Sequence, residues 1–304
     1  MNAADIVTDA SRRADFVLLF DVTDGNPNGD PDAGNLPRVD PETMQGLVTD
    51  VCLKRKVRNF VDATRAGKAG MEIYVKHHGV LNEQHERAYE AEDIEPTNKP
   101  DEDTMDTVRQ WMCANFYDVR AFGAVMTTGV NCGQVRGPLQ LTFARSVDPV
   151  VPLDLSITRV AVTRSEDKMK AVEGSDEKEA TGKVTEMGRK TLIPYGLYLC
   201  RGFYNPHLGE DTGFGDEDLA LFWEALRRMW ELDRSASRGM MACRGLYVFT
   251  HDSKLGEAPA HELFELVSVE RKDGVEAPRS FNDYTVNVDR ETVPDGVTLT
   301  AIVG

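Results

Sequence analysis

The chain has 304 residues, of which 41% are hydrophobic, and a formal net charge of -16 at pH 7. Its length suffices for one elaborated domain or two, and its composition is that of a globular protein. The acidic charge argues against indiscriminate binding to nucleic acid. No apolar run approaches the length of a membrane helix, and the N-terminus lacks the apolar centre of a signal peptide, so we expect a cytoplasmic protein without a membrane partner.

Local charge departs from this average in two places. Residues 83–106 contain ten acids and two bases, whereas residues 120–145 contain no acid. The five cysteines form no CxxC pair, and the adjacent His77 and His78 would point to opposite faces of a strand. We therefore expect no metal site and no cofactor, and an acidic surface whose basic tracks would restrict nucleic acid to a defined groove.

The N-terminal part of the chain predicts a strand, a loop and a helix. Residues 16–20 are all apolar and predict a buried strand, and residues 21–37 are crowded with the Asn, Asp, Gly and Pro of an ordered loop. Asp40, Pro41 and Glu42 have the order of an N-cap and a first helical turn. We expect the helix that begins there to continue to residue 60.

One face of this expected helix changes from apolar to basic along its length. Its apolar stripe consists of Met44, Leu47, Val48 and Val51. The positions that continue the stripe by one turn are Lys54, Arg55 and Arg58. Basic residues at a helix end also suit the helix dipole. Two interpretations remain open, a solvated helix end and an anion site whose natural ligand is phosphate.

The middle of the chain alternates between strand and helix signals. The expected elements are a strand at 71–79, an exposed and partly helical insertion at 83–100, a helix at 104–116, a glycine-rich loop at 129–137 and a strand at 137–144. Residues 158–191 are rich in Lys, Glu, Ser, Thr and Gly. They fit a surface loop or a long projecting hairpin, and composition alone favours the loop.

The C-terminal part supplies a second set of elements. The expected elements are a strand at 193–203, an amphipathic helix at 216–230, a turn of small residues at 235–239, and strands at 245–250, 261–269 and 284–288. The order strand, helix, strand occurs twice, which predicts an α+β fold with a ferredoxin-like core. In that core an antiparallel sheet carries helices on one face and leaves the other face free.

Carboxylates in the first loop allow two chemical interpretations. The segment 24–29 reproduces the start of a calcium-binding loop, but Asn35 stands at the position of the bidentate Glu, which argues against an EF-hand. Asp30 or Asp32 could assist metal-dependent attack on a phosphodiester, although no further acids are seen to converge there. The simplest interpretation is that Asn and Asp side chains fix the loop through its own backbone. No GxxxxGK[ST], GxSxG or HExxH motif is present, which favours a binding protein over an enzyme.

Three segments are similar to one known family. They are residues 20–31, which contain the sequence Asn-Pro-Asn-Gly-Asp, residues 52–55, which read Cys-Leu-Lys-Arg, and residues 119–124. Together they resemble the Cas-seven (Cas7) family, and within it the backbone subunit of type I-C CRISPR surveillance complexes, sometimes called the Csd-two type. The resemblance implies a modified RNA-recognition (RRM) fold with a palm, helical fingers and a projecting β-hairpin thumb. We expect residues 1–304 to form a single elaborated RRM-like domain, with a fingers-type insertion at 81–116 and a thumb-type insertion at 158–192.

The resemblance also implies a function. A subunit of this kind is non-catalytic, binds guide RNA (crRNA), oligomerises along it and presents it for pairing with target DNA in a Cascade complex. The implied partners are crRNA, further copies of the chain, Cas-five type and Cas-eight type large and small subunits, and the target DNA strand by way of the guide. The implied RNA-binding residues are Asn26, Asn28, Gln45, Lys54, Arg55, Arg58, Arg120, Phe122, Gln134, Arg136, Lys168, Met169 and Arg238.

Some alternatives stay open. Met169 is the expected wedge at a kink in the RNA, with Leu192 or Ile193 as substitutes. Related subunits of type III complexes cleave target RNA with a loop Asp, so a metal-dependent ribonuclease that uses Asp30 or Asp32 is the alternative function. A third hypothesis is a protein that self-associates without nucleic acid.

Overall fold

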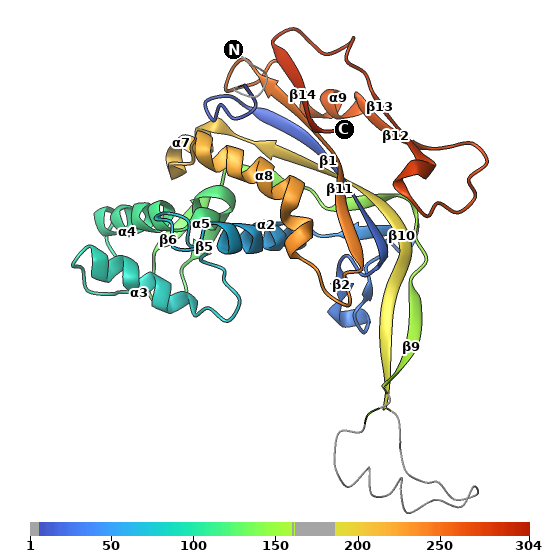
Figure 1. Cartoon of the computed structure of the whole chain (residues 1–304). Coiled ribbons are helices and arrows are strands. Elements are labelled where there is room, and N and C mark those ends of the chain that lie inside the picture. Colours follow the sequence, from blue (N-terminus) through green and yellow to red (C-terminus); the bar gives the residue numbers. More distant parts are fainter. Residues whose placement is uncertain (1–5, 160, 162–185) are drawn as a thin grey trace, which may run out of the picture.

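A computed structural model describes residues 6–159, 161 and 186–304 of the chain. Its centre is an eight-stranded sheet with the strand order β14-β11-β1-β10-β8-β4, in which β7 and β9 also pair with β10 (Figure 1). All of these pairings are antiparallel. The strands are β1 Ala14–Gly25, β4 Gln45–Val48, β7 Leu139–Leu141, β8 Ala144–Pro149, β9 Leu153–Arg159, β10 Glu186–Tyr204, β11 Met240–His251 and β14 Val297–Val303. The chain is therefore a mixed α/β protein with a large antiparallel sheet.

Strand β1 lies inside this sheet and is buried on both faces. Phe16, Leu18 and Phe20 belong to the core beneath helices α2 (Asp50–Thr64) and α8 (Asp216–Leu232). Val17 and Leu19, which alternate with them, point to the other face and belong to a second core. Because both faces need apolar residues, the strand appears in the sequence as an uninterrupted apolar run, and its prediction is confirmed.

The second face of the sheet is covered, and the expectation of a free face is wrong. Helix α9 (Ala260–Glu265) and the hairpin of β12 (Val267–Arg271) and β13 (Tyr284–Val288) lie over it (Figure 1). Leu263 and Phe264 pack there against the apolar side chains of β1 and β11. The predicted strand at 261–269 is accordingly a short helix followed by a strand.

Helix α2 begins ten residues later than Asp40, and residues 45–48 form strand β4 instead. The Asp40 carboxylate caps a turn, where it accepts hydrogen bonds from the backbone N–H groups of Glu42 and Thr43 at 3.0 and 3.3 Å. The chain then reverses through Met44, whose φ is 57°. The N-cap is Thr49, whose side chain accepts from the Cys52 N–H at 3.2 Å. The apolar residues on the buried face of the helix are Leu53, Val57, Phe60 and Val61, whereas Val51, expected in the apolar stripe, is 64% exposed.

Strands β9 and β10 form a two-stranded ribbon that projects from the sheet (Figure 1). The register pairs Leu153 with Leu192 and Arg159 with Glu186. Composition favoured a loop for residues 158–191. That prediction is wrong at the two ends of the segment, which form paired strands. Residues 160 and 162–185 lie outside the described part of the chain.

A smaller unit beside the sheet has its own apolar core, which includes Tyr89, Val108, Met112 and Phe116. Its elements are α3 Leu81–Ala91, α4 Glu102–Asn115, α5 Tyr117–Phe122, β5 Gly123–Met126 and β6 Gly133–Arg136. The strand predicted at 71–79 is absent, and only an isolated bridge joins Glu72 to Phe116. The N–H groups of Tyr74 and Val75 donate to the Asp118 carboxylate instead of to a neighbouring strand. The remaining short elements are β2 Gly29–Asp30, η1 Pro31–Ala33, β3 Leu36–Pro37, α7 Pro206–Thr212 and η2 Phe281–Asp283.

Candidate nucleic-acid interface

Helix α2 presents two polar sides, one on each flank of an exposed strip. At about 100° per residue, Thr49, Cys52 and Lys56 share one side. Lys54, Arg55 and Arg58 lie on the opposite side. The strip between them carries Val51 and Asn59, which are exposed, and Asp62, which is half-buried. The loop after β1, which the sequence placed in one interface with the basic residues, contacts the first of these two sides through Thr49 and Cys52.

The loop that follows β1 is held in shape by its own asparagines. The Asn28 Oδ1 atom accepts hydrogen bonds from the backbone N–H and the hydroxyl of Thr49, both at 3.0 Å. Asn26 is 3% exposed, and its Nδ2 donates to the Asn35 carbonyl at 2.8 Å. Both side chains form hydrogen bonds with other residues of the protein. A ligand at the loop would therefore meet mainly the loop backbone, beside the start of α2.

The basic side of α2 is partly covered. Lys54 Nζ lies 3.2 Å from the Asp50 carboxylate, 3.4 Å from Gln140 Oε1 and 5.6 Å from the centre of the Phe122 ring. Arg55 is half-buried and donates to the Val75 carbonyl at 2.6 Å. Burial lowers the pKa of Arg55, and the nearby charge of Arg58 adds to that shift. Arg55 and Lys54 both remain partly exposed, although only 12% of the Lys54 side chain is accessible, and both can approach an anion.

Arg58 lies deeper and has an acidic partner. Its Nε donates to Asp118 Oδ2 at 2.7 Å, and the two side chains are 10% and 1% exposed. The same carboxylate accepts from the backbone of Tyr74 and Val75. The Phe122 ring, 5.3 Å from the Arg58 guanidinium, belongs to a residue that is 6% exposed. Arg58 and Phe122 therefore tie α2 to α5 from below the surface.

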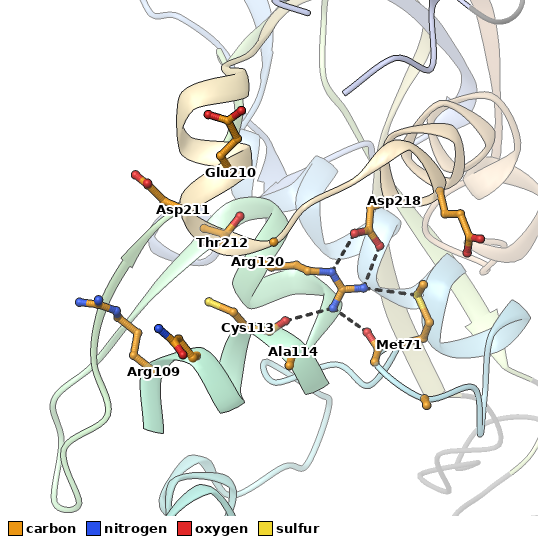
Figure 2. Close-up of a pocket in the computed structure, with 14 residues that line it drawn as sticks. Met71, Arg109, Cys113, Ala114, Arg120, Glu210, Asp211, Thr212 and Asp218 are labelled. Carbon is orange, nitrogen blue, oxygen red and sulfur yellow. Dashed lines mark hydrogen bonds and ion pairs between the residues drawn. The ribbon is translucent and has the colours of Figure 1, made fainter. Parts of the chain in front are cut away.

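Arg120 forms the floor of a cleft of about 630 Å³ between α4, α7 and the start of α8 (Figure 2). Its guanidinium donates to both carboxylate oxygens of Asp218, at 2.9 and 2.7 Å, and to the carbonyls of Gly70 and Cys113. Both side chains are less than 10% exposed. With a fifth contact, from Nη2 to the Met71 sulfur at 3.7 Å, these hydrogen bonds leave the guanidinium no free donor face for a ligand. Asp211 and Arg109 also line this cleft (Figure 2).

The remaining expected residues differ in their availability. Gln134 and Arg136 are exposed on β6, and Arg136 makes no hydrogen bond or ion pair with the described residues. Gln45 donates through Nε2 to the Ser146 carbonyl at 3.0 Å. Arg238 donates to the carbonyls of Asn26 and Pro27 at 3.2 and 2.8 Å. Lys168 and Met169 lie outside the described residues.

The loop carboxylates do not gather around a metal position. Asp30 caps η1 by accepting from the Asp32 N–H at 3.2 Å, and it lies 3.4 Å from Arg38 Nη1. Asp32 is exposed. The described ranges 6–159, 161 and 186–304 contain no group of three or more His, Cys, Asp or Glu side chains that could hold a metal ion. Within the same ranges no helix is long and apolar enough to span a membrane.

The sequence model of the family described as "CRISPR-associated protein Cas7" matches residues 12–289. This chain belongs to the Cas7 family. A curated relative, the CRISPR-associated protein Cas7 of Haloferax volcanii, is 24% identical over 321 aligned positions, which cover 96% of this chain and 86% of that protein.

Chains from three solved structures of CRISPR assemblies align with part of this chain. One, titled as a CRISPR RNA-guided surveillance complex, pre-nicking, matches with a TM-score of 0.48 and 17% identity over 78% of this chain and 75% of the other. A second CRISPR RNA-guided surveillance complex matches with a TM-score of 0.47 and 15% identity over 87% and 78%. A type III-B Cmr-beta complex bound to cognate target RNA matches with a TM-score of 0.38 and 10% identity over 81% and 63%.

In this Cas7-family chain, sequence reasoning missed the acids that hold the interface together. Asp118 and Asp218 partner Arg58 and Arg120 across 60 and 98 residues of sequence, and no local pattern links them. Lys56 was also missed, although a signal existed. It stands seven residues after Thr49 on a helix, and that spacing places it on the side that faces the loop.

Proposed function

We propose that this chain is a non-catalytic backbone subunit of a type I-C CRISPR Cascade complex. It binds crRNA, oligomerises along it in the cytoplasm and presents it for pairing with target DNA, next to Cas-five type and Cas-eight type subunits. The observation that carries the proposal is the Cas7 family match over residues 12–289.

The sheet order supports a modified RRM or ferredoxin-like palm. Along the chain the core elements follow as β1, α2, β8, β10, α8 and β11, and in the sheet the strands follow as β11, β1, β10 and β8. We assign residues 81–116 to the fingers. We assign residues 158–192 to the thumb, whose base is the β9–β10 ribbon.

The RNA path in this proposal crosses the exposed strip of α2. Lys54, Arg55 and Arg136 contact phosphates, because their charged groups reach the surface. Gln45 and Gln134 add polar contacts, and Lys168 and Met169 act from the thumb. The other expected residues shape the path from within the protein. They are Asn26, Asn28, Arg58, Arg120, Phe122 and Arg238.

The test is purification of the chain with its partner subunits from cells that transcribe a CRISPR array. We expect a large complex with a high ratio of absorbance at 260 to 280 nm, and small RNA of uniform length on a denaturing gel. A nucleic-acid-free assembly whose size is unchanged by ribonuclease would contradict the proposal and favour self-association alone. Cleavage of RNA that needs a divalent ion and is lost in Asp30→Asn or Asp32→Asn would contradict the non-catalytic role.

A double variant tests the proposed phosphate contacts. Lys54→Ala with Arg136→Ala should weaken RNA binding and lower the slope of log K against log salt by about two units, one for each contact. The matched control is Arg228→Ala with Lys254→Ala, which removes two partly exposed cations from elsewhere on the surface. Equal salt slopes in the two double variants would contradict an RNA path along α2.

A further inference from the structure

Lys56 is the most deeply buried cation of α2, and it is not among the expected RNA contacts. It is 1% exposed and forms an ion pair with Asp233, the residue that follows α8. Its ammonium lies 5.8 Å from the centre of the Trp230 ring. Burial lowers the pKa of Lys56 to about 8, and the charge of Arg238 adds to that shift. Removing the partner of such a buried charge would be destabilising, because the charge would be left unpaired.

The partner acid connects Lys56 to the loop after β1. Asp233 Oδ2 also lies 3.4 Å from Arg238 Nε. The other end of the Arg238 guanidinium donates through Nη1 to the carbonyls of Pro27 and Asn26, at 2.8 and 3.2 Å. The link between α8 and β11 therefore lies beside this loop, as Figure 1 shows next to β2.

The backbones of the two segments are also in close contact. The Asn26 N–H donates to the Ser237 carbonyl at 2.7 Å. A Cβ atom at Gly25 would lie 2.0 Å from the Arg238 carbonyl oxygen, so only glycine fits there. The side of α2 that carries Lys56 reaches the same loop through Cys52, whose Sγ donates to the Pro27 carbonyl at 3.5 Å.

We infer that Lys56, Asp233 and Arg238 form a loop clamp, a set of positioning residues that fixes the backbone of the Asn26-Pro27-Asn28 loop for RNA binding. The inference rests on the proposed function and deepens it, because it assigns Arg238 to the loop and not to a phosphate. The clamp needs arginine. One planar group faces a carboxylate with Nε and two carbonyls with Nη1, and a lysine ammonium cannot span both positions.

The test compares Arg238→Lys with Arg234→Lys, a matched control in the same turn whose side chain is 58% exposed and paired only with Glu231 among the described residues. Amide hydrogen exchange of residues 26–35 is measured without RNA, and RNA affinity is then measured at several salt concentrations. In Arg238→Lys we expect exchange of the loop to rise, and affinity to fall, by about tenfold or more, because hydrogen bonds from a charged group are lost. The salt slope should not change, since no phosphate contact is removed. Arg234→Lys should behave as wild type.

Lys56→Met with Asp233→Asn gives an independent measurement on the same clamp. The pair is removed without leaving an unpaired buried charge, so the fold is retained, and exchange of residues 26–35 should again rise.

Three results would overturn the clamp. The first is unchanged hydrogen exchange of the loop in Arg238→Lys. The second is increased exchange of the loop in that variant with unchanged RNA affinity. The third is full RNA affinity in Arg238→Lys together with a salt slope that is about one unit lower in Arg238→Ala. The last result would make Arg238 a phosphate contact. Failure of the wild-type protein to bind guide RNA would instead overturn the proposed function, and loop exchange in the RNA-free protein distinguishes that failure from failure of the clamp.

Discussion

Arg120 and Asp218 form a buried, two-pronged ion pair that joins α5 to the start of α8. Arg58 with Asp118 and Lys56 with Asp233 are similar pairs. Each pair joins segments that are distant in sequence. A basic residue in a nucleic-acid-binding protein can thus serve the ligand or an internal acid, and only its burial and partner distinguish the two roles.

Replacing Arg120 by methionine should lower the free energy of unfolding by about 3–5 kcal/mol, because Asp218 is left as an unpaired buried charge. Urea denaturation measures the loss. Arg109→Met is the control, since Arg109 is 39% exposed and its change should stay within about 0.5 kcal/mol. Adding Asp218→Asn to Arg120→Met should recover part of the loss, and a single variant as stable as wild type would contradict the role of the pair.

His85 makes the stability of the α3–α4 unit depend on pH. Its Nδ1 donates to the Val130 carbonyl at 2.8 Å and its Nε2 accepts from the Tyr74 hydroxyl at 2.7 Å, as suits a neutral ring. Burial lowers the pKa of His85 from its ordinary value of 6.5. Between the two values the unfolded chain binds more protons, so stability falls as the pH drops through this window and stays low beneath it.

We therefore expect the melting temperature to fall between about pH 7.5 and about pH 5, and the fall to be smaller in His85→Gln. Differential scanning calorimetry at both pH values measures it. His261→Gln is the control, because His261 is 76% exposed and its replacement should not alter the pH dependence. An equal fall in His85→Gln and wild type would rule out His85 as its cause.

Among the helices and strands, the sequence correctly predicts the ones in which all residues favour the same type of secondary structure. Strand β1 is apolar at every position from Phe16 to Phe20, and α8 has a regular apolar stripe after three acids, so both are confirmed. The predicted start of α2 was wrong because Asp40 and Pro41 fit a capped turn as well as a helix N-terminus. Leu47 and Val48 then fit either period, and only pairing of β4 with β8 decides between them.

The candidate site was predictable to a similar degree. The loop rests on the N-terminal turn of α2, at Thr49 and Cys52, whereas Lys54, Arg55 and Arg58 lie on another side of the helix. The burial of Arg58 and Arg120 was not predictable, because it depends on acids brought near by packing. Family motifs mark which positions matter, but they do not say whether a side chain meets the ligand or another residue.

Strand β10 offers a test of packing within the sheet. A Cβ atom at Gly202 would lie 2.1 Å from the Phe16 ring, in the middle of the core. Gly202→Ala should therefore lower the free energy of unfolding by about 1–3 kcal/mol through overpacking. Gly188→Ala on the same strand is the control, since its Cβ would lie 3.4 Å from Ile157 on the exposed ribbon. Equal stability of the two variants would show that Phe16 moves aside without cost.

For the whole molecule, the described residues divide into a sheet with cores on both faces, a smaller unit with its own core, and a ribbon. Every residue of β9 is exposed, and the ribbon projects into solvent (Figure 1). Its apolar side chains include Leu153, Leu155 and Ile157, which point to one face. The ribbon therefore contributes little to folding of the isolated chain.

Replacing residues 156–189 by Asn-Gly should leave the denaturation midpoint unchanged, because Leu155 and Lys190 are paired and a two-residue turn can join them. Under the proposed function, the shortened chain should fail to form ordered oligomers on crRNA. Circular dichroism and electron microscopy measure the two effects, with the full chain as control. Normal oligomers of the shortened chain would contradict the assignment of the thumb.

Strand β10 is continuous over 19 residues, from the ribbon into the centre of the sheet. Ile193, which is fully buried, pairs with Gly25 at the point where β1 ends and the loop begins. Thr191 donates from Oγ1 to the Asn35 carbonyl at 3.0 Å, which ties the ribbon to the far end of that loop. Ile193 is thus the residue at which β10 passes from pairing with β9 in the ribbon to pairing with β1 in the sheet. A displacement of the ribbon relative to the sheet would therefore act on both ends of the loop, through the backbone pairing at Gly25 and the hydrogen bond at Asn35.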